Sequence, residues 1–556
     1  MSIRTLPQDL VAFCEAHRRP VGALALLGSI FIFLVSVLPN LADHPTLTDD
    51  EMWVLSSAYK LAKEGVFGSD MFAGFYHADT HYYFNMPAHH VVIAAALKLL
   101  GYGVVQARLV GVVYGIATIV LVYVLARRLY GVAAAVLALA LLLFLRLNIG
   151  FDTGLPLQES AANLRYDLAP VPFMLAAALL LLGPSTWRRA AAVGVLIGVA
   201  TLLQFYGLFL LPVAAVFLWL EALPRQQRLR LVGALVGACA LAGVPFGVYI
   251  LAHFDDYKGQ TGTVDQRDDF TSPRFFIDNL LNEPDRFLRP LAFKEIPKGE
   301  DPATVSPRYL DISEMATRRP SAKLAVLAGL PFAIAFAAWR ALKADSRGDR
   351  LLALCLAGLV AQLALLESTK FFIYWIPVFP FLCIGVAGGV VWLLTPENWN
   401  RLRLAAAAFA VVALLLVFAE GSAARIGGLR TARDAASYDA LAAQIHETVP
   451  AGSRVVGATS LWWAMRDTDY RSYFLFFYLT RPDSGPYKTT ISGFLDDFDP
   501  DYLVMTQLAD SELTNHLSPT DYEDWQRYLR DHAERIAHLE GGPARPYDYV
   551  DIWRIR

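Results

Sequence analysis

Long uncharged apolar runs constrain the fold of this chain more than any other feature. Charged residues fall into short clusters between these runs, and 56% of the 556 residues are hydrophobic. A helix needs roughly 20 apolar residues to cross the hydrocarbon core of a bilayer. So large an apolar content in so long a chain is untypical of a soluble enzyme. The sequence therefore predicts an α-helical polytopic membrane protein.

About 11 transmembrane helices are expected from the lengths of the runs. The run from 190 to 220 is long enough for two short helices that turn near Gly207. The other runs each accommodate a single crossing. The predicted spans are 21–38, 109–126, 129–145, 168–183, 190–220 (two helices), 231–252, 324–339, 351–366, 371–395 and 404–419.

Basic residues in the short loops predict the orientation, because Lys and Arg next to a spanning helix are retained in the cytoplasm. With a cytoplasmic N-terminus, one side receives Arg18, Arg19, Arg127, Arg128, Arg188, Arg189, Arg401 and Arg403. The outer loops 41–105 and 253–322 and the C-terminal part then lie outside the cytoplasm. This arrangement suits a protein of the bacterial inner (plasma) membrane.

Composition divides the chain into a membrane module, residues 1–420, and an extracytoplasmic α/β domain, residues 421–556. In the first outer loop, residues 51–65 read as an amphipathic surface helix, and residues 87–101 as a re-entrant or interfacial helix. Periodicity in the C-terminal part predicts helices at 438–449 and 519–540 and strands at 453–460, 500–507 and 547–555.

Several chemistries lack their sequence signatures here. The four cysteines lie in the N-terminal tail or in spanning runs, so no disulfide framework is predicted. The chain has no Cys-His zinc spacing, no nucleotide-phosphate loop and no nucleic-acid motif. We therefore expect neither ATP-driven chemistry nor a nucleic-acid partner.

Three consecutive carboxylates follow the first span in the segment TLTDDEMW. Thr48 and Glu51 have the spacing of a capping box, which explains both residues as a helix start. Capping does not require Asp50, so Asp50 is a candidate for cation binding or for proton transfer from a hydroxyl. Asp49 is a candidate of second rank.

Two further groups of polar residues are candidates. Arg165 and Asp167 stand at the start of the fourth predicted span, where an interfacial ion pair and a catalytic role are both open. In HADTH, His77, Asp79 and His81 alternate as metal ligands can on an extended segment, although a polar loop without metal is the favoured interpretation. They stay second-rank candidates.

Four segments in order, DDEMW, MPAHHVVIAAALKLLG with QARLVGVVYG, RYD and ESTKFFIYWIPVFPFL, resemble the GT-C glycosyltransferases. The resemblance covers roughly residues 20 to 395 and is to protein O-mannosyltransferases and lipid A aminoarabinose transferases. It implies catalytic roles for Asp50, Glu51 and Asp167. It also implies donor-phosphate binding by Arg108 and Lys370. Arg165 is a third candidate to bind the phosphate, because its guanidinium is a charge-assisted hydrogen-bond donor.

The sequence departs from this family's pattern at two places. It has His89 and His90 after a single proline where relatives often have a basic residue and two prolines, and these histidines are second-rank candidates. Gln204 stands where a lysine is common. Relatives also differ in metal dependence, so a divalent ion at Asp50 and Asp167 is left open.

The resemblance implies an enzyme that moves a sugar from a polyprenyl-phosphate carrier to an envelope lipid, glycan or protein, with inversion. A phosphate leaving group needs charge stabilisation, and an acceptor hydroxyl needs a general base, which fits arginines beside an aspartate. A transporter or lipid flippase is the alternative, since both also carry acids in broken helices. A non-catalytic scaffold is a third possibility.

Overall fold

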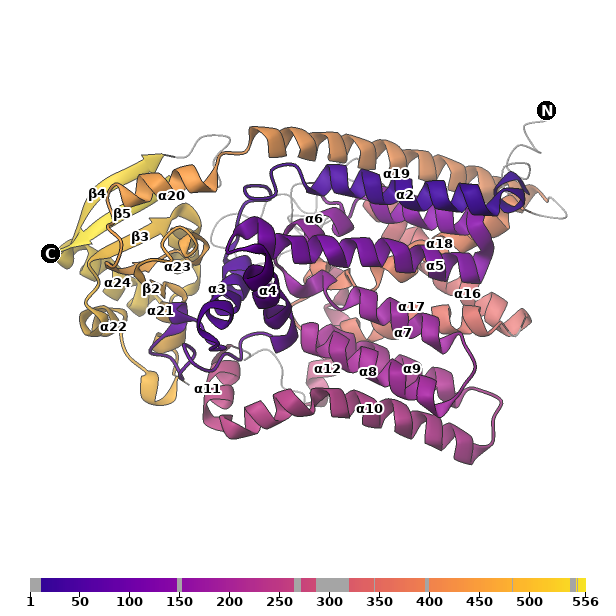
Figure 1. The fold of residues 1–556 in the computed structure, drawn as a ribbon, viewed down its shortest axis with the longest axis horizontal. Helices are drawn as coiled ribbons and strands as arrows, with labels where there is room; N and C mark the ends of the chain where they lie inside the picture. Colours follow the sequence, from indigo (N-terminus) through magenta and orange to yellow (C-terminus); the bar gives the residue numbers. More distant parts are fainter. Residues whose placement is uncertain are drawn as a thin grey trace.

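The computed structural model describes residues 12–147, 153–264, 272–286, 320–344, 346–395, 400–482, 484–540, 547 and 549–556. In Figure 1 the long helices lie side by side as one body, and a small sheet lies beyond its end, with helices α3 and α4 between the two. The predicted helical membrane protein with a C-terminal sheet is thus confirmed in outline.

Among the described residues, six segments are long and apolar enough to cross a membrane. They are α2 (Arg18–Val37), α5 (Val104–Phe144), α10 (Arg225–Ala252), the segment Pro320–Lys343, α17 (Arg347–Leu366) and α19 (Arg401–Asp434). Within Pro320–Lys343, helix α15 (Pro320–Lys323) leads through the π-helical η6 (Leu324–Gly329) into α16 (Leu330–Lys343). The chain is therefore an integral membrane protein with several spans.

The chain also has shorter apolar helices. They are α4 (Pro87–Leu100), α7 (Val171–Leu181), α8 (Trp187–Leu203), α9 (Leu210–Trp219) and α18 (Phe379–Leu394). The run 190–220 is split as expected, because η3 (Phe205–Phe209) separates α8 from α9. The runs 109–126 and 129–145 are joined in α5 across Gly131, whose φ of 86° interrupts the helix.

The predicted surface helix of the first loop is α3 (Asp49–Glu64), with η1 (Asp70–Phe72) after it. Three acids stand in the first turn of α3, where the helix dipole favours negative charge. Gly65 ends α3 with a φ of 76°. In the second loop, the described residues form α11 (Phe254–Val264) and α12 (Pro273–Leu281). Residues 287–319 of that loop lie outside the described part.

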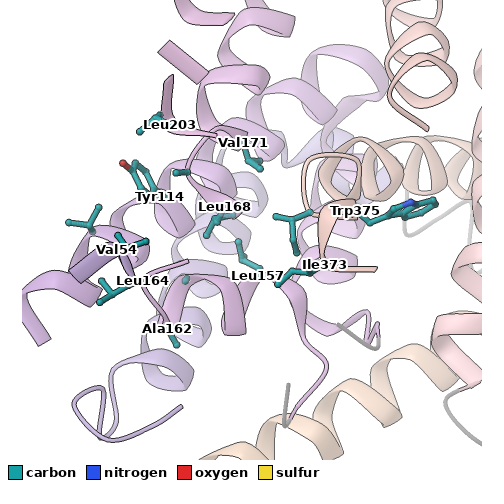
Figure 2. Close-up of a cluster of buried hydrophobic side chains, with 14 of the residues drawn as sticks. Val54, Tyr114, Leu157, Ala162, Leu164, Leu168, Val171, Leu203, Ile373 and Trp375 are labelled. Atoms are coloured by element: carbon teal, nitrogen blue, oxygen red, sulfur yellow. The ribbon is translucent and has the colours of Figure 1, made fainter. Parts of the chain in front are cut away.

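A short segment between α5 and α7 brings polar residues to the end of the helical body. It consists of α6 (Pro156–Ala162) and η2 (Tyr166–Leu168). Gly111 of α5 permits its close approach, because a Cβ there would lie 2.5 Å from the Ala161 carbonyl oxygen. Figure 2 shows apolar side chains of this segment, among them Leu164 and Leu168, in one cluster with Val171 and Ile373. The segment is thereby held against a solid core.

We call residues 438–556 the C-terminal α/β region. Its mixed sheet has the order β2-β1-β3-β5-β4, with β1 parallel to β2 and β3, and β5 antiparallel to β3 and β4. The strands are β1 (Arg454–Gly457), β2 (Asp469–Ser472), β3 (Tyr502–Thr506), β4 (Ala533–Glu540) and β5 (Tyr549–Ile555). The helices are α20 (Tyr438–His446), α21 (Phe474–Thr480), α22 (Ile491–Phe498), α23 (Gln507–His516) and α24 (Pro519–His532), with the short η8 (Thr459–Leu461) and η9 (Gly485–Tyr487).

One predicted helix of this region is wrong in its second half. The helix expected over 519–540 ends at His532, and residues 533–540 form strand β4. The reason is tertiary: β4 pairs with β5 along most of its length, from Ala533 opposite Ile555 to Glu540 opposite Tyr549. Strand pairing overrides a weak local helical preference.

The C-terminal α/β region packs directly on helix α3. Trp53 meets the rings of Phe474 and Tyr478 edge-on, at centroid distances of 5.3 and 6.2 Å. The hydroxyl of Tyr547 donates to the carbonyl of Leu47 over 3.0 Å, just before the helix begins. The division expected at residue 420 stays a prediction, and helix α19 continues unbroken past it to Asp434.

Candidate functional site

The three acids at the start of α3 point to three different parts of the molecule. Successive residues of an α-helix are about 100° apart, since a turn takes 3.6 residues. Glu51 is buried against α5, Asp49 is bonded to the C-terminal α/β region, and the Asp50 side chain is 60% exposed. Among these three, Asp50 is the carboxylate open to a ligand.

Glu51 forms a buried ion pair with Arg108 of helix α5. The Arg108 Nε and Nη2 atoms lie 3.0 and 2.8 Å from the two carboxylate oxygens, and both side chains are fully buried. Arg108 also donates to the Leu41 carbonyl over 3.0 Å. Glu51 in turn accepts the backbone N–H groups of Thr48 and Leu164.

The family resemblance implied phosphate binding by Arg108 and a catalytic role for Glu51, and both roles stay predictions. A guanidinium without exposed surface cannot meet a lipid phosphate without first breaking its pair. In the structure, both residues fix the start of α3 to α5 and to the segment at Leu164.

Arg165 joins the other two predicted catalytic acids. Its Nε atom lies 2.8 Å from Asp167 Oδ2, and its Nη1 atom is hydrogen-bonded to Asp50. The Asp167 side chain is 2% exposed, and its Oδ1 atom has no hydrogen-bond partner among the described residues. The structure thus brings Asp50, Arg165 and Asp167 together, and the roles predicted for them stay predictions.

This arrangement does not favour the predicted metal at Asp50 and Asp167. The guanidinium of Arg165 already stands between the two carboxylates and supplies the positive charge that a metal would bring. Within the described residues, neither acid belongs to a cluster that could hold an ion. A group of side chains that could hold a cation, His81, His253 and Asp256, lies elsewhere, between the first and second loops.

Three tyrosines and one glutamate that were not predicted as site residues lie near Arg165 and Asp167. Tyr206 of η3 donates a hydrogen bond to Glu367, and its ring centroid is 4.8 Å from that of Tyr374. Tyr166 is within electrostatic range of Tyr374 and Asp50. The sequence feature that could have pointed to them is Glu367, a single carboxylate at the end of an apolar run. It stands in the segment ESTKFFIYWIPVFPFL, which carried the resemblance.

Lys370, predicted to bind phosphate, is engaged elsewhere. Its Nζ atom lies 3.0 Å from Glu283 and donates to the Ala364 carbonyl over 2.8 Å, and the side chain is 3% exposed. Arg286 pairs with the same Glu283 at 2.8 Å. Burial lowers the pKa of Lys370. No ion pair among the described residues joins Lys370 to Asp50 or Asp167, so its role at the site stays a prediction.

His77 and His81 do meet an acid, but it is not Asp79. Their Nδ1 atoms lie 2.9 and 2.8 Å from the two oxygens of Asp256 in α11, and this hydrogen bond raises the pKa of His77. His253 stacks on His81 with a centroid distance of 3.6 Å. His81, His253 and Asp256 each offer one ligand atom, and these atoms lie within 4.8 Å of one another.

His89 and His90 are buried supports of the first loop. The Nε2 atom of His89 lies 2.9 Å from the Leu164 carbonyl oxygen. The Nδ1 atom of His90 lies 2.5 Å from Ser57 Oγ and 3.2 Å from the Val54 carbonyl oxygen. Both residues therefore tie α4 to its neighbours, and neither contacts Asp50 or Arg165 among the described hydrogen bonds.

Comparisons with known proteins agree with this architecture. Residues 85–249 match the family model described as dolichyl-phosphate-mannose-protein mannosyltransferase. ArnT from Cupriavidus metallidurans, solved with undecaprenyl phosphate, shares 16% identity and a TM-score of 0.56, over 96% of this chain and 97% of that one. No curated protein sequence matches the chain significantly.

A second solved structure is also similar. The oligosaccharyltransferase AglB from Archaeoglobus fulgidus, in complex with an inhibitory peptide and a dolichol-phosphate, shares 13% identity and a TM-score of 0.54, over 95% of this chain and 74% of that one. These matches confirm the predicted resemblance to the GT-C glycosyltransferases, in sequence over residues 85–249 and in fold over most of the chain.

Proposed function

We propose that this GT-C-type membrane protein transfers a sugar, a hexose or a pentose, from a polyprenyl-phosphate carrier to an acceptor hydroxyl outside the cytoplasm. The acceptor class is an envelope lipid, glycan or protein. The observation that carries the proposal is the bridge of Arg165 between exposed Asp50 and buried Asp167. The lipid phosphate bound to ArnT and the dolichol-phosphate bound to AglB support the donor class.

Arg165 is the group that binds the donor phosphate in this proposal. Guanidinium and phosphate form strong charge-assisted hydrogen bonds in a fixed geometry. Asp167 accepts a hydrogen bond from Arg165 Nε and stays buried. Arg165 therefore keeps its orientation when its Nη1 atom leaves Asp50 and binds the donor phosphate. This exchange releases the Asp50 carboxylate beside the reacting sugar.

Asp50 is the general base. It accepts the proton of the acceptor hydroxyl while the acceptor oxygen bonds to the anomeric carbon. The bond from that carbon to the phosphate oxygen breaks, and both electrons leave with the polyprenyl phosphate, whose charge Arg165 stabilises. Attack from the side opposite the leaving group inverts the anomeric centre.

The test is product analysis with purified protein in nanodiscs, supplied with polyprenyl-phosphate sugars and an extract of envelope acceptors. We expect wild type to transfer the sugar and Asp50→Asn to lose transfer, because an amide cannot take the proton. Asp531→Asn, an exposed acid of α24, is the matched control and should behave as wild type. Equal transfer by wild type and Asp50→Asn would refute the role of Asp50.

We also propose that His81, His253 and Asp256 bind a zinc ion. Two imidazoles and a carboxylate suit zinc in type, and their ligand atoms are already gathered. AglB was also solved in complex with Zn and sulfate, at 12% identity and a TM-score of 0.50. Bound there, the ion would join the first loop to the start of α11 and supply structural support.

A further inference from the structure

Two carboxylates from distant parts of the chain meet at one tyrosine hydroxyl. The hydroxyl oxygen of Tyr473 lies 3.1 Å from Asp49 Oδ2 and 2.6 Å from Glu512 Oε2. Asp49 begins helix α3, Tyr473 precedes α21, and Glu512 belongs to α23. The other oxygen of Asp49 accepts the backbone N–H of Ser460 over 2.6 Å. The C-terminal α/β region thus holds the first turn of α3 through hydrogen bonds to Asp49, and we call this contact the grip on α3.

The number of protons at this contact is limited. A tyrosine hydroxyl carries one hydrogen and can donate to only one of its two neighbours. If both carboxyls were ionised, the other one would face the lone pairs of the tyrosine oxygen, and burial makes such a contact costly. The arrangement is satisfied when one carboxyl is protonated, so that Asp49 donates to Tyr473 and Tyr473 donates to Glu512.

The surroundings support a proton on Asp49. Burial, followed by the charge of Glu512, raises the pKa of Asp49 to about 7, and burial also raises the pKa of Glu512. The shorter distance, from Tyr473 to Glu512, is the one expected for an ionised acceptor. The titratable and charged groups facing the two acids are Tyr470, Tyr473, Tyr547, Asp50 and His516.

This contact lies one residue from the proposed base. Asp49 and Asp50 share the first turn of α3, so an anchor on Asp49 limits how far Asp50 can move relative to Arg165. One turn further on, Trp53 packs against Phe474 of the same C-terminal α/β region. Packing of Trp53 therefore fixes where helix α3 lies. The hydrogen bonds at Asp49 fix how its first turn is rotated about the helix axis, and so the direction in which Asp50 points.

We propose that Asp49, Tyr473 and Glu512 share one proton and act as positioning residues, through which the C-terminal α/β region holds Asp50 in place for transfer. The part concerning transfer rests on the proposed function, whereas the grip on α3 does not. Loss of the shared proton at alkaline pH leaves an unsatisfied carboxylate and loosens the first turn of α3.

Hydrogen exchange of the peptide covering residues 47–64, in the full chain in nanodiscs at pH 6 and pH 8, tests the grip. After correction for the intrinsic rate, wild type should exchange faster at pH 8 than at pH 6. Tyr473→Phe should exchange about tenfold faster than wild type at pH 6, because it removes the hydroxyl to which Asp49 of α3 is bonded, and about tenfold is the upper end of the effect of one neutral hydrogen bond. Tyr549→Phe removes another tyrosine–carboxylate bond of the same region, with Asp510, and should leave this peptide unchanged.

Two isosteric variants make the test sharper. The amide of Asp49→Asn mimics the protonated acid, and Glu512→Gln removes the second charge, so neither variant needs the shared proton. Both should abolish the difference between pH 6 and pH 8. Exchange that is equal in wild type at both pH values, or equally altered by Tyr473→Phe and Tyr549→Phe, would overturn the proposal.

Transfer assays then address positioning. Tyr473→Phe should lower kcat about tenfold, with the donor KM within twofold of wild type. We also expect wild-type kcat to fall between pH 7 and pH 8 as the shared proton is lost, and we expect no such fall in Glu512→Gln. If the exchange results hold but wild type transfers no sugar, the proposed function fails and the grip stands. If wild type transfers sugar and kcat of Tyr473→Phe matches Tyr549→Phe, the positioning role is refuted.

Discussion

Replacing Arg108 with methionine separates a structural role from a donor-binding role. The substitution removes three hydrogen bonds, two to Glu51 and one to the Leu41 carbonyl. Methionine fills much of the same volume, so the main effect is on Glu51. Its carboxylate would stay fully buried with only the backbone N–H groups of Thr48 and Leu164 as donors.

The expected cost is large for a single substitution. Breaking a buried ion pair by removing one partner costs about 3–5 kcal/mol, because the other charge is left uncompensated. Since each 1.4 kcal/mol is a factor of ten, a loss of this size in the unfolding barrier shortens the half-life of the folded protein by about 100-fold or more. The double variant Arg108→Met with Glu51→Gln removes the buried charge and should recover much of this loss.

The assay is the time course of unfolding at a fixed elevated temperature in detergent, followed by tryptophan fluorescence. Arg274→Gln is the matched control, because it breaks an exposed pair with Asp278 that contributes at most about 1 kcal/mol. If Arg108→Met unfolds as slowly as wild type but binds the donor phosphate poorly, the structural assignment of Arg108 is wrong and the role implied by the resemblance is right.

Three other predictions concern the site and its surroundings. Arg165→Gln should raise the donor KM about 10- to 100-fold, the value of a charge-assisted hydrogen bond, in steady-state transfer assays. His253→Ala should lower the zinc content measured by mass spectrometry from one equivalent per chain, whereas the exposed His532→Ala should not. Asp49 has a pKa of about 7 in the folded chain against 3.8 ordinarily, so its contribution to stability is full below pH 3.8 and falls as pH rises to 7. The loss is at most about 4 kcal/mol, and half-lives of unfolding from pH 4 to 8 should show a shallower decline in Asp49→Asn.

Much of the helical body could be predicted from the sequence because its signals are local. Uncharged apolar runs predicted the six long apolar helices found among the described residues, and apolar residues at helical spacing with Gly65 at their end predicted helix α3. The split near Gly207 followed from the length of one run. Strand β4 was missed because its partner β5, and not its own sequence pattern, determines its conformation.

The partners of the site residues could not be predicted, because they depend on which distant segments the fold brings together. Glu51 is 57 residues from Arg108, and Asp50 is 115 residues from Arg165. The HADTH segment suggested ligands within five residues, whereas Asp256 lies 175 residues beyond His81. Residue types can suggest chemistry, but the fold decides which group can reach a ligand. The Arg108 side chain is fully buried, whereas the Arg165 side chain is 17% exposed.

The row of three acids at 49–51 can be understood as a joint between three parts of the molecule. Glu51 is bound to the helical body through α5, Asp49 to the C-terminal α/β region through Ser460, and Asp50 faces Arg165. Because neighbouring residues on a helix face directions about 100° apart, one turn can serve all three. A shift of one residue would exchange the three roles, so the anchors on either side of Asp50 determine which acid reaches the site. Capping alone would have needed only one of these acids, Glu51.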